Sequence, residues 1–162
     1  LDSHDTARFR NVVGTDPMRH IAGMGLLLTY PGVPSIYAGD ELGLEGQWGE
    51  DGRRTIDWSR QSWDHDFLSE VKKLIKIRRQ SHALAQGGLR WILIEDDLLA
   101  FERESKREKI LVVVSRAAQK VKIEGITEVK QRLYGPELKG QIYKSDAASL
   151  GIYRLSYSRS QR

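Results

Sequence analysis

The chain has no cysteine, no internal repeat and no apolar run long enough to cross a membrane. Without cysteine it can form neither a disulfide scaffold nor a thiolate metal site, which agrees with the cytoplasmic location that we expect. A spanning helix needs about 20 consecutive apolar residues, and none of the 162 residues belong to such a run. We therefore expect no membrane partner.

Concentrated positive charge is also missing. The 26 lysines and arginines exceed the 22 acidic residues by a formal net charge of +4, and they are dispersed among those acids. Nucleic-acid-binding domains gather their cations on one face or along one helix, so we expect no nucleic-acid partner. The histidines His20, His65 and His82 have no second ligand at metal spacing, and we assign neither a metal nor a cofactor.

The most informative segment is the opening LDSHDTARF (residues 1–9), which places His4, Asp5 and Arg8 within five residues. A consecutive Ser-His-Asp run is not a catalytic triad, because triad members meet from distant parts of a chain. The alternative interpretation is a solvated loop, or a helix N-cap formed by Ser3 or Asp5. A site-like cluster rarely opens a polypeptide, and the first residue is not Met, so we interpret the chain as the C-terminal piece of a larger enzyme.

A second motif, PGVPSIYAGDELG at residues 31–43, favours the enzyme interpretation over a solvated loop or a helix cap. The two segments together resemble the α-amylase family of glycoside hydrolases, most closely its α-glucosidase, neopullulanase and oligo-1,6-glucosidase branches. In that family a loop ending in His-Asp follows the seventh strand of a (β/α)8 barrel, and a run of the second kind forms the eighth strand. The DGRRTIDW segment at residues 51–58 is similar to the loop that follows.

The resemblance implies a fold in two parts. Residues 1–88 would form the C-terminal portion of the catalytic TIM barrel, from the loop after strand seven through helix eight. Residues 89–162 would form a small antiparallel β-sandwich.

The resemblance also implies the site residues. Asp5 matches the carboxylate that stabilises the positive charge developing on the distorted sugar, and His4 matches an imidazole that hydrogen-bonds the same sugar. Arg8 corresponds to an arginine that holds the terminal sugar or pairs with a nearby acid, and a loop salt bridge without substrate contact is the alternative. The nucleophilic Asp and the acidic Glu of this family lie upstream of such a segment. The substrate implied is an α-glucan or malto-oligosaccharide, and the fragment alone would be inactive.

The residues themselves predict compatible elements. Residues 15–17 supply a capping oxygen and a proline that start a helix, which ends at residues 30–32. The apolar residues 33–38 suit a buried strand, and residues 62–64 can cap a second long helix that ends near residues 83–87. Beyond residue 88 the pattern alternates, and about seven strands are expected, with a two-residue hairpin turn at residues 96–97.

Other polar and aromatic residues of the first part receive structural interpretations. Asp40 and Glu41 are adjacent carboxylates, and we interpret them as a turn-anchoring pair bonded to Arg53 or Arg54. Packing is expected for Trp58, while Trp48 is left open between packing and stacking on a sugar.

Three classes of function follow. The first is a fragment of a retaining α-glucan hydrolase; the second is a non-catalytic amylase-like protein; the third is a β-domain with a structural or glucan-binding role. An isolated barrel segment would expose strand edges and apolar helix faces, so we expect the fragment to be oligomeric or strand-exchanged.

Overall fold

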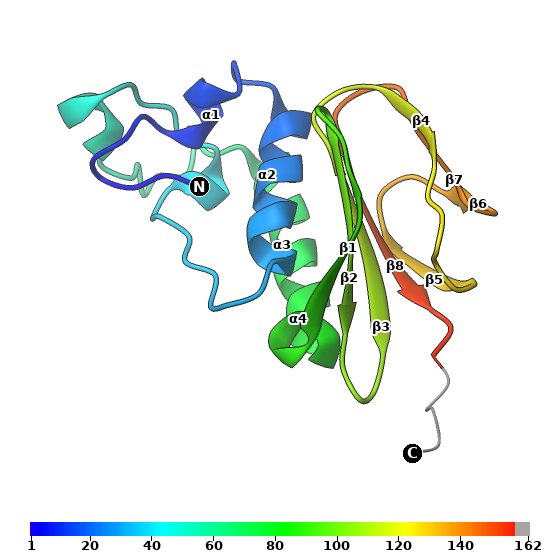
Figure 1. Ribbon diagram of the computed structural model, residues 1–162. Coiled ribbons are helices and arrows are strands. Elements are labelled where there is room, and N and C mark those ends of the chain that lie inside the picture. The colour runs from blue at the N-terminus through cyan, green and yellow to red at the C-terminus, as the bar shows by residue number, and fades with distance from the viewer. Residues whose placement is uncertain (158–162) are drawn as a thin grey trace.

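The computed structural model describes residues 1–157, which form three layers: helices, a five-stranded sheet in the middle, and a three-stranded sheet on its other side (Figure 1). The helices are α1 (Phe9–Val12), α2 (Pro17–Thr29), α3 (His65–Gln80) and α4 (His82–Gln86), with the 3-10 helices η1 (Asp40–Leu42) and η2 (Gly49–Arg53). The strands are β1 (Gly88–Ile94), β2 (Leu98–Glu104), β3 (Lys109–Ser115), β4 (Gln119–Lys122), β5 (Val129–Tyr134), β6 (Leu138–Lys139), β7 (Ile142–Ser145) and β8 (Ser149–Leu155). Within this part of the chain, no helix has both the length and the hydropathy to cross a membrane.

The starts of α2 and α3 lie where they were predicted. Asp16 caps α2, since its carboxylate accepts hydrogen bonds from the backbone N–H groups of Met18 and Arg19 at 2.8 and 3.2 Å. Asp64 caps α3 through the N–H of Phe67 at 3.0 Å. A carboxylate in this position satisfies N–H groups that have no partner inside the helix.

The second predicted helix is divided into α3 and α4, whereas the sequence predicted one continuous helix. Ser81 ends α3 and also caps α4, because its hydroxyl oxygen accepts the N–H of Leu84 at 3.1 Å. Glu108 reaches from the β-sheet side and accepts the N–H of Ala83 at 3.0 Å. The Glu108 carboxylate thus bonds an N–H group at the start of α4 from outside the helical layer. The sequence around α4 does not reveal this contact.

The predicted strand at residues 33–38 is not formed, and this is a correction. Val33 is 96% exposed, and no segment among residues 1–157 pairs with this stretch. A strand needs a neighbour for its N–H and C=O groups, and the strands downstream pair with one another instead. The start of the stretch is anchored by Arg78, which donates to the carbonyl oxygens of Leu28 at 2.8 Å and Gly32 at 2.6 Å.

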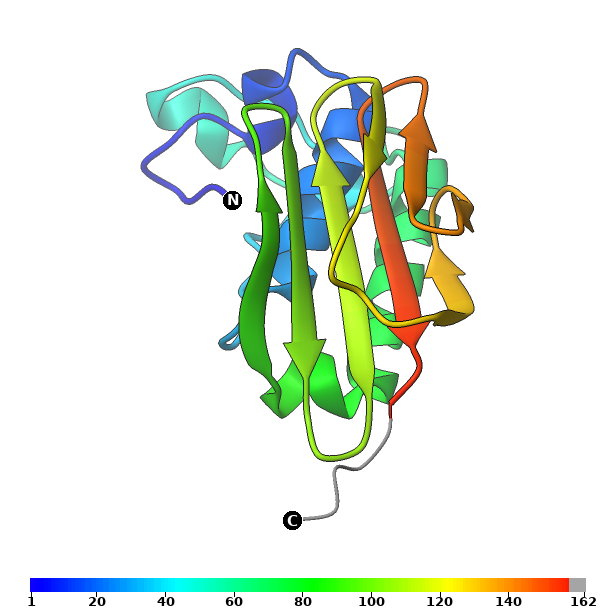
Figure 2. The same cartoon turned by 45° about the vertical axis from the view of Figure 1, so that its right-hand side comes forward.

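Both sheets are antiparallel, as predicted. The strand orders are β1-β2-β3-β8-β5 and β4-β7-β6, and Figure 2 shows the long strands side by side with the helices behind them. The two-residue hairpin turn is confirmed by the paired backbone hydrogen bonds of Glu95 and Leu98 that enclose residues 96–97. Residues 1–157 form eight strands rather than about seven, and β6 and β7, with two and four residues, are too short to stand out in the sequence.

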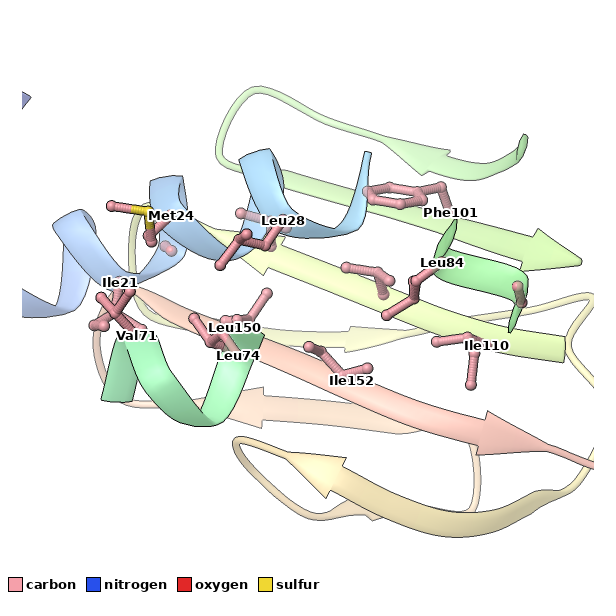
Figure 3. Packing of buried hydrophobic residues seen from close by; sticks show 14 of the residues in the cluster. Ile21, Met24, Leu28, Val71, Leu74, Leu84, Phe101, Ile110, Leu150 and Ile152 are labelled. Carbon is pink, nitrogen blue, oxygen red and sulfur yellow. The ribbon is translucent and has the colours of Figure 1, made fainter. Parts of the chain in front are cut away.

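Two buried clusters lie on opposite faces of the central sheet. The first joins the helices to the sheet, and Figure 3 shows Leu28 of α2 and Leu74 of α3 beside Leu150 of β8. The second fills the space against the three-stranded sheet, with members on β2, β3, β6, β7 and β8. Because the first cluster contains residues from both sides of position 88, the helical and β parts share one core; a domain boundary at 88 stays a prediction.

Candidate active site

His4 and Asp5 lie in a short turn that its own neighbours hold closed. The Ser3 N–H donates to the Thr6 hydroxyl at 2.9 Å, and the Asp5 N–H donates to the Ser3 hydroxyl at 3.2 Å. Ser and Thr bond nearby backbone groups readily in turns, so this run folds on itself without forming a helix. Of the two alternative interpretations of Ser3 and Asp5, a solvated loop and a helix N-cap, the exposed turn agrees with the first, since neither residue caps a helix.

The two predicted site side chains lie together and open to solvent. The imidazole Nε2 of His4 lies 3.1 Å from Oδ2 of Asp5, and the side chains are 66% and 68% exposed. The other carboxylate oxygen, Oδ1, lies 3.5 Å from the guanidinium Nη2 of Arg53. An imidazole, a carboxylate and a guanidinium thus converge at one accessible point, which is suited to binding hydroxyl groups and stabilising positive charge.

Arg53 contacts the turn that carries His4 and Asp5, which the sequence did not predict. Its Nε donates to the carbonyl oxygen of His4 at 3.0 Å, and its Nη1 lies 3.1 Å from Glu50. The predicted pairing of Asp40 and Glu41 with Arg53 or Arg54 is therefore wrong, since Arg54 pairs with Asp51 instead. Nothing in the local pattern of residues 51–58 reveals a contact that spans 49 positions.

Arg8 turns inward and organises the loops around the site. Only 2% of the residue is exposed, and its guanidinium donates to the carbonyl oxygens of Gly52 at 2.9 Å and Ala38 at 3.0 Å. The guanidinium carbon also lies 4.0 Å from the centre of the Tyr37 ring, within cation–π range. These contacts account for the side chain without a sugar, so a direct substrate contact by Arg8 stays a prediction.

The joined loops occupy the side of the helical layer that faces away from the sheets, where Figure 1 shows the blue N-terminal segment beside the cyan segment that contains η1 and η2. Gly52 makes this approach possible, since a Cβ atom there would lie 2.8 Å from the carbonyl oxygen of Thr6. Any larger residue at position 52 would push η2 away from the turn.

Asp40 is a buried carboxyl group beside a second one. Asp40 is 1% exposed, and neither of its oxygens has a donor in the described residues. The Asp2 carboxyl lies within hydrogen-bonding reach, a bond that requires a proton on one of the two groups. Burial, and then the Asp2 carboxyl, raise the pKa of Asp40 to about 8, while the nearby Arg8 opposes that rise. Glu41 instead holds its own turn by accepting the N–H of Gly39 at 2.9 Å.

The raised pKa of Asp40 predicts a pH-dependent stability. The folded chain keeps a proton that the unfolded chain releases above its ordinary pKa of 3.8, so this group's stabilisation is complete below that value and is lost as the pH rises through about 8. The free energy of unfolding of Asp40→Asn, measured with urea and taken relative to that of the unchanged chain, should therefore rise by about 1 kcal/mol or more from pH 5 to pH 8. The matched change at Asp146, whose side chain is 92% exposed, should give no such gain. An Asp40→Asn difference that is equal at both pH values would contradict the assignment.

The histidines elsewhere form no metal site in the part of the chain that the structure describes. His20 is fully buried between Phe9 and Phe67, with ring centroids 5.6 and 4.2 Å away. Burial, together with the charge of Arg10, lowers the pKa of His20 to about 4, so the ring is a neutral core residue at pH 7.

The two tryptophans of the loop after η1 are surface residues. Trp58 is 75% exposed and meets Trp63 edge to face at 6.2 Å, so the packing role expected for it is wrong. Trp48 is 73% exposed at the start of η2.

Comparison with known proteins bears on the family of the chain. Residues 1–79 match the model of the alpha amylase catalytic domain. The chain is 32% identical over 119 residues to a cyclomaltodextrinase from Thermoanaerobacter pseudethanolicus. This match covers 74% of this chain and 21% of that enzyme. It is 35% identical over 115 residues to an intracellular maltogenic amylase from Bacillus subtilis strain 168, covering 69% of this chain and 19% of that protein. The chain thus spans about a fifth of the length of these curated relatives.

A solved structure agrees with the overall fold. The debranching enzyme from Nostoc punctiforme, crystallised and soaked with acarbose, superposes with a TM-score of 0.80 at 28% identity, over 95% of this chain and 32% of that one. The superposition covers the helical and the β parts together.

Proposed function

The chain belongs to the α-amylase family of glycoside hydrolases, and on that premise we propose that it supplies the transition-state-stabilising carboxylate of a retaining α-glucan hydrolase. The observation that carries the proposal is the exposed His4–Asp5 pair, with 3.1 Å between Nε2 and Oδ2, inside the segment that matches the catalytic domain. A carboxylate held open to solvent beside an imidazole is available to a ligand in a way that a buried pair is not.

The proposed roles follow from the chemistry of glycoside cleavage. A retaining enzyme uses one carboxylate as the nucleophile and one carboxylic acid to protonate the leaving oxygen, about 5 Å apart. The family resemblance assigns these two groups to residues outside this sequence. Asp5 stabilises the positive charge on the sugar ring, an interaction that strengthens in the transition state, and His4 uses its remaining ring nitrogen to bond a hydroxyl group of the same sugar.

The same proposal covers the fold of the longer protein. Residues 1–88 form the last portion of its barrel, and residues 89–157 belong to the β-sandwich predicted for residues 89–162, of which residues 158–162 lie outside the described part of the chain. The 96% exposed Val33, in a stretch that pairs with no strand among residues 1–157, supports this, because an apolar side chain left so open is suited to contact with the rest of a barrel. Residues 1–162 alone would then lack activity.

The proposal is tested by assaying the full-length protein on maltotriose, pullulan and p-nitrophenyl α-glucoside, with the 162-residue chain beside it. We expect turnover by the full-length protein and none by the chain. A full-length protein that is inactive on all three substrates would overturn the proposal and favour a non-catalytic amylase-like protein.

A further inference from the structure

We infer that Arg53 is a positioning residue that orients the Asp5 carboxylate for its role in the reaction; this inference rests on the proposed function. Arg53 reaches the His-Asp turn by two separate contacts. Its Nε donates to the His4 carbonyl oxygen at 3.0 Å, and its Nη2 lies 3.5 Å from Oδ1 of Asp5. A planar guanidinium with a fixed fork of donors can hold a backbone oxygen and a carboxylate at once, whereas a lysine ammonium acts as a point charge.

The two oxygens of Asp5 are divided between two partners. Oδ2 lies against the His4 imidazole at 3.1 Å, and Oδ1 faces Arg53. The remaining contacts of the turn, from Ser3 and Thr6, involve the backbone and leave the Asp5 side chain free. At 68% exposure the carboxylate has little packing to select one rotamer, so the charge of Arg53 restricts a side chain that would otherwise rotate.

Arg53 is itself placed by the surrounding loop. Arg8 holds the carbonyl of the preceding residue, Gly52, at 2.9 Å, and Gly52 lies so close to Thr6 that only glycine fits. Glu50 then binds Nη1 of Arg53 at 3.1 Å from one turn earlier in η2. The guanidinium is therefore directed at the turn by a buried arginine, a glycine and an acidic neighbour.

The expected role is in catalysis rather than in stability. Exposed ion pairs contribute about 0 to 1 kcal/mol to folding, and the Arg53 side chain is 43% exposed, so its loss should barely change the thermal midpoint. A misplacement of about 1 Å in a reacting group can cost about 100-fold in rate. Because Asp5 acts on the transition state, that cost should fall on kcat more than on KM.

Arg54 provides a matched control. It is the adjacent residue of the same type, and it binds Asp51 at 2.7 Å rather than the His-Asp turn. In the full-length protein, Arg53→Ala should lower kcat by about 10- to 100-fold with KM changed less than about 3-fold. Arg54→Ala should leave both constants within about 2-fold of the unchanged protein, and Arg53→Lys should retain part of the activity since it keeps the charge.

Chemical rescue separates positioning from a structural role. Guanidinium ion added to the Arg53→Ala variant should restore part of its kcat, because the site is open to solvent, and it should not affect Arg54→Ala. If Arg53→Ala matches Arg54→Ala while Asp5→Asn abolishes turnover, the inference is overturned and the proposed function stands. If the unchanged full-length protein is inactive, both are overturned.

Discussion

Replacing Asp5 with Asn in the full-length protein is expected to lower kcat by about 10³-fold or more while leaving the fold intact. Amide and carboxylate have nearly the same shape, so the variant removes the negative charge without opening a cavity. The lost charge is the one proposed to stabilise the cationic transition state, and a preorganised charge of this kind is among the largest single contributions to catalysis. The substrate's KM should change far less.

Stability serves as the internal control for this variant. Because the Asp5 side chain is 68% exposed, Asp5→Asn should change the free energy of unfolding by less than about 0.5 kcal/mol. Asp146→Asn, the same chemical change at a 92% exposed side chain in the β part, should affect neither rate nor stability. An Asp5→Asn protein that keeps its full kcat would remove Asp5 from the catalytic residues.

Features that depend on near neighbours were predictable from the sequence. The caps at Asp16 and Asp64 and the hairpin turn at residues 96–97 use hydrogen bonds between residues two or three positions apart. The turn that carries His4 and Asp5 is equally local, which is why a motif of a few residues could identify it. Apolar runs also located most of the long strands, although β3 and β8 are buried on both faces, so their burial does not alternate.

Features that depend on distant partners were not predictable. Residues 33–38 have the composition of a buried strand, yet they remain unpaired because composition does not supply the neighbouring strand. Arg53 meets the His-Asp turn across 49 positions, and Glu108 caps α4 from 25 positions away. Arg8 lies three positions after Asp5, yet its side chain turns into the loop, because Gly52 and Ala38 offer it carbonyl oxygens there.

Removing Arg8 should have the largest effect on stability among the changes considered. Arg8→Ala in the 162-residue chain is expected to lower the free energy of unfolding by about 3 kcal/mol, measured by urea denaturation. Two carbonyl oxygens, on Gly52 and Ala38, lose a charged donor, and the Tyr37 ring loses its cation–π partner. Arg8→Met keeps the aliphatic stem and should recover only the packing part of that loss.

A comparison with Arg19 tests whether the burial of Arg8 causes the loss of stability in Arg8→Ala. The Arg19 side chain is 52% exposed and meets Asp16 at 3.7 Å, so Arg19→Ala should cost less than about 0.5 kcal/mol. Equal losses for Arg8→Ala and Arg19→Ala would contradict the structural role of Arg8. A contact between Arg8 and the sugar would instead raise KM in the full-length protein and leave stability unchanged. Arg8 holds Gly52, and Gly52 precedes Arg53, so we expect Arg8→Ala to lose stability and kcat together. Hydrogen exchange should accelerate first at the backbone N–H of position 8, which donates to the carbonyl oxygen of Gly46 at 2.8 Å.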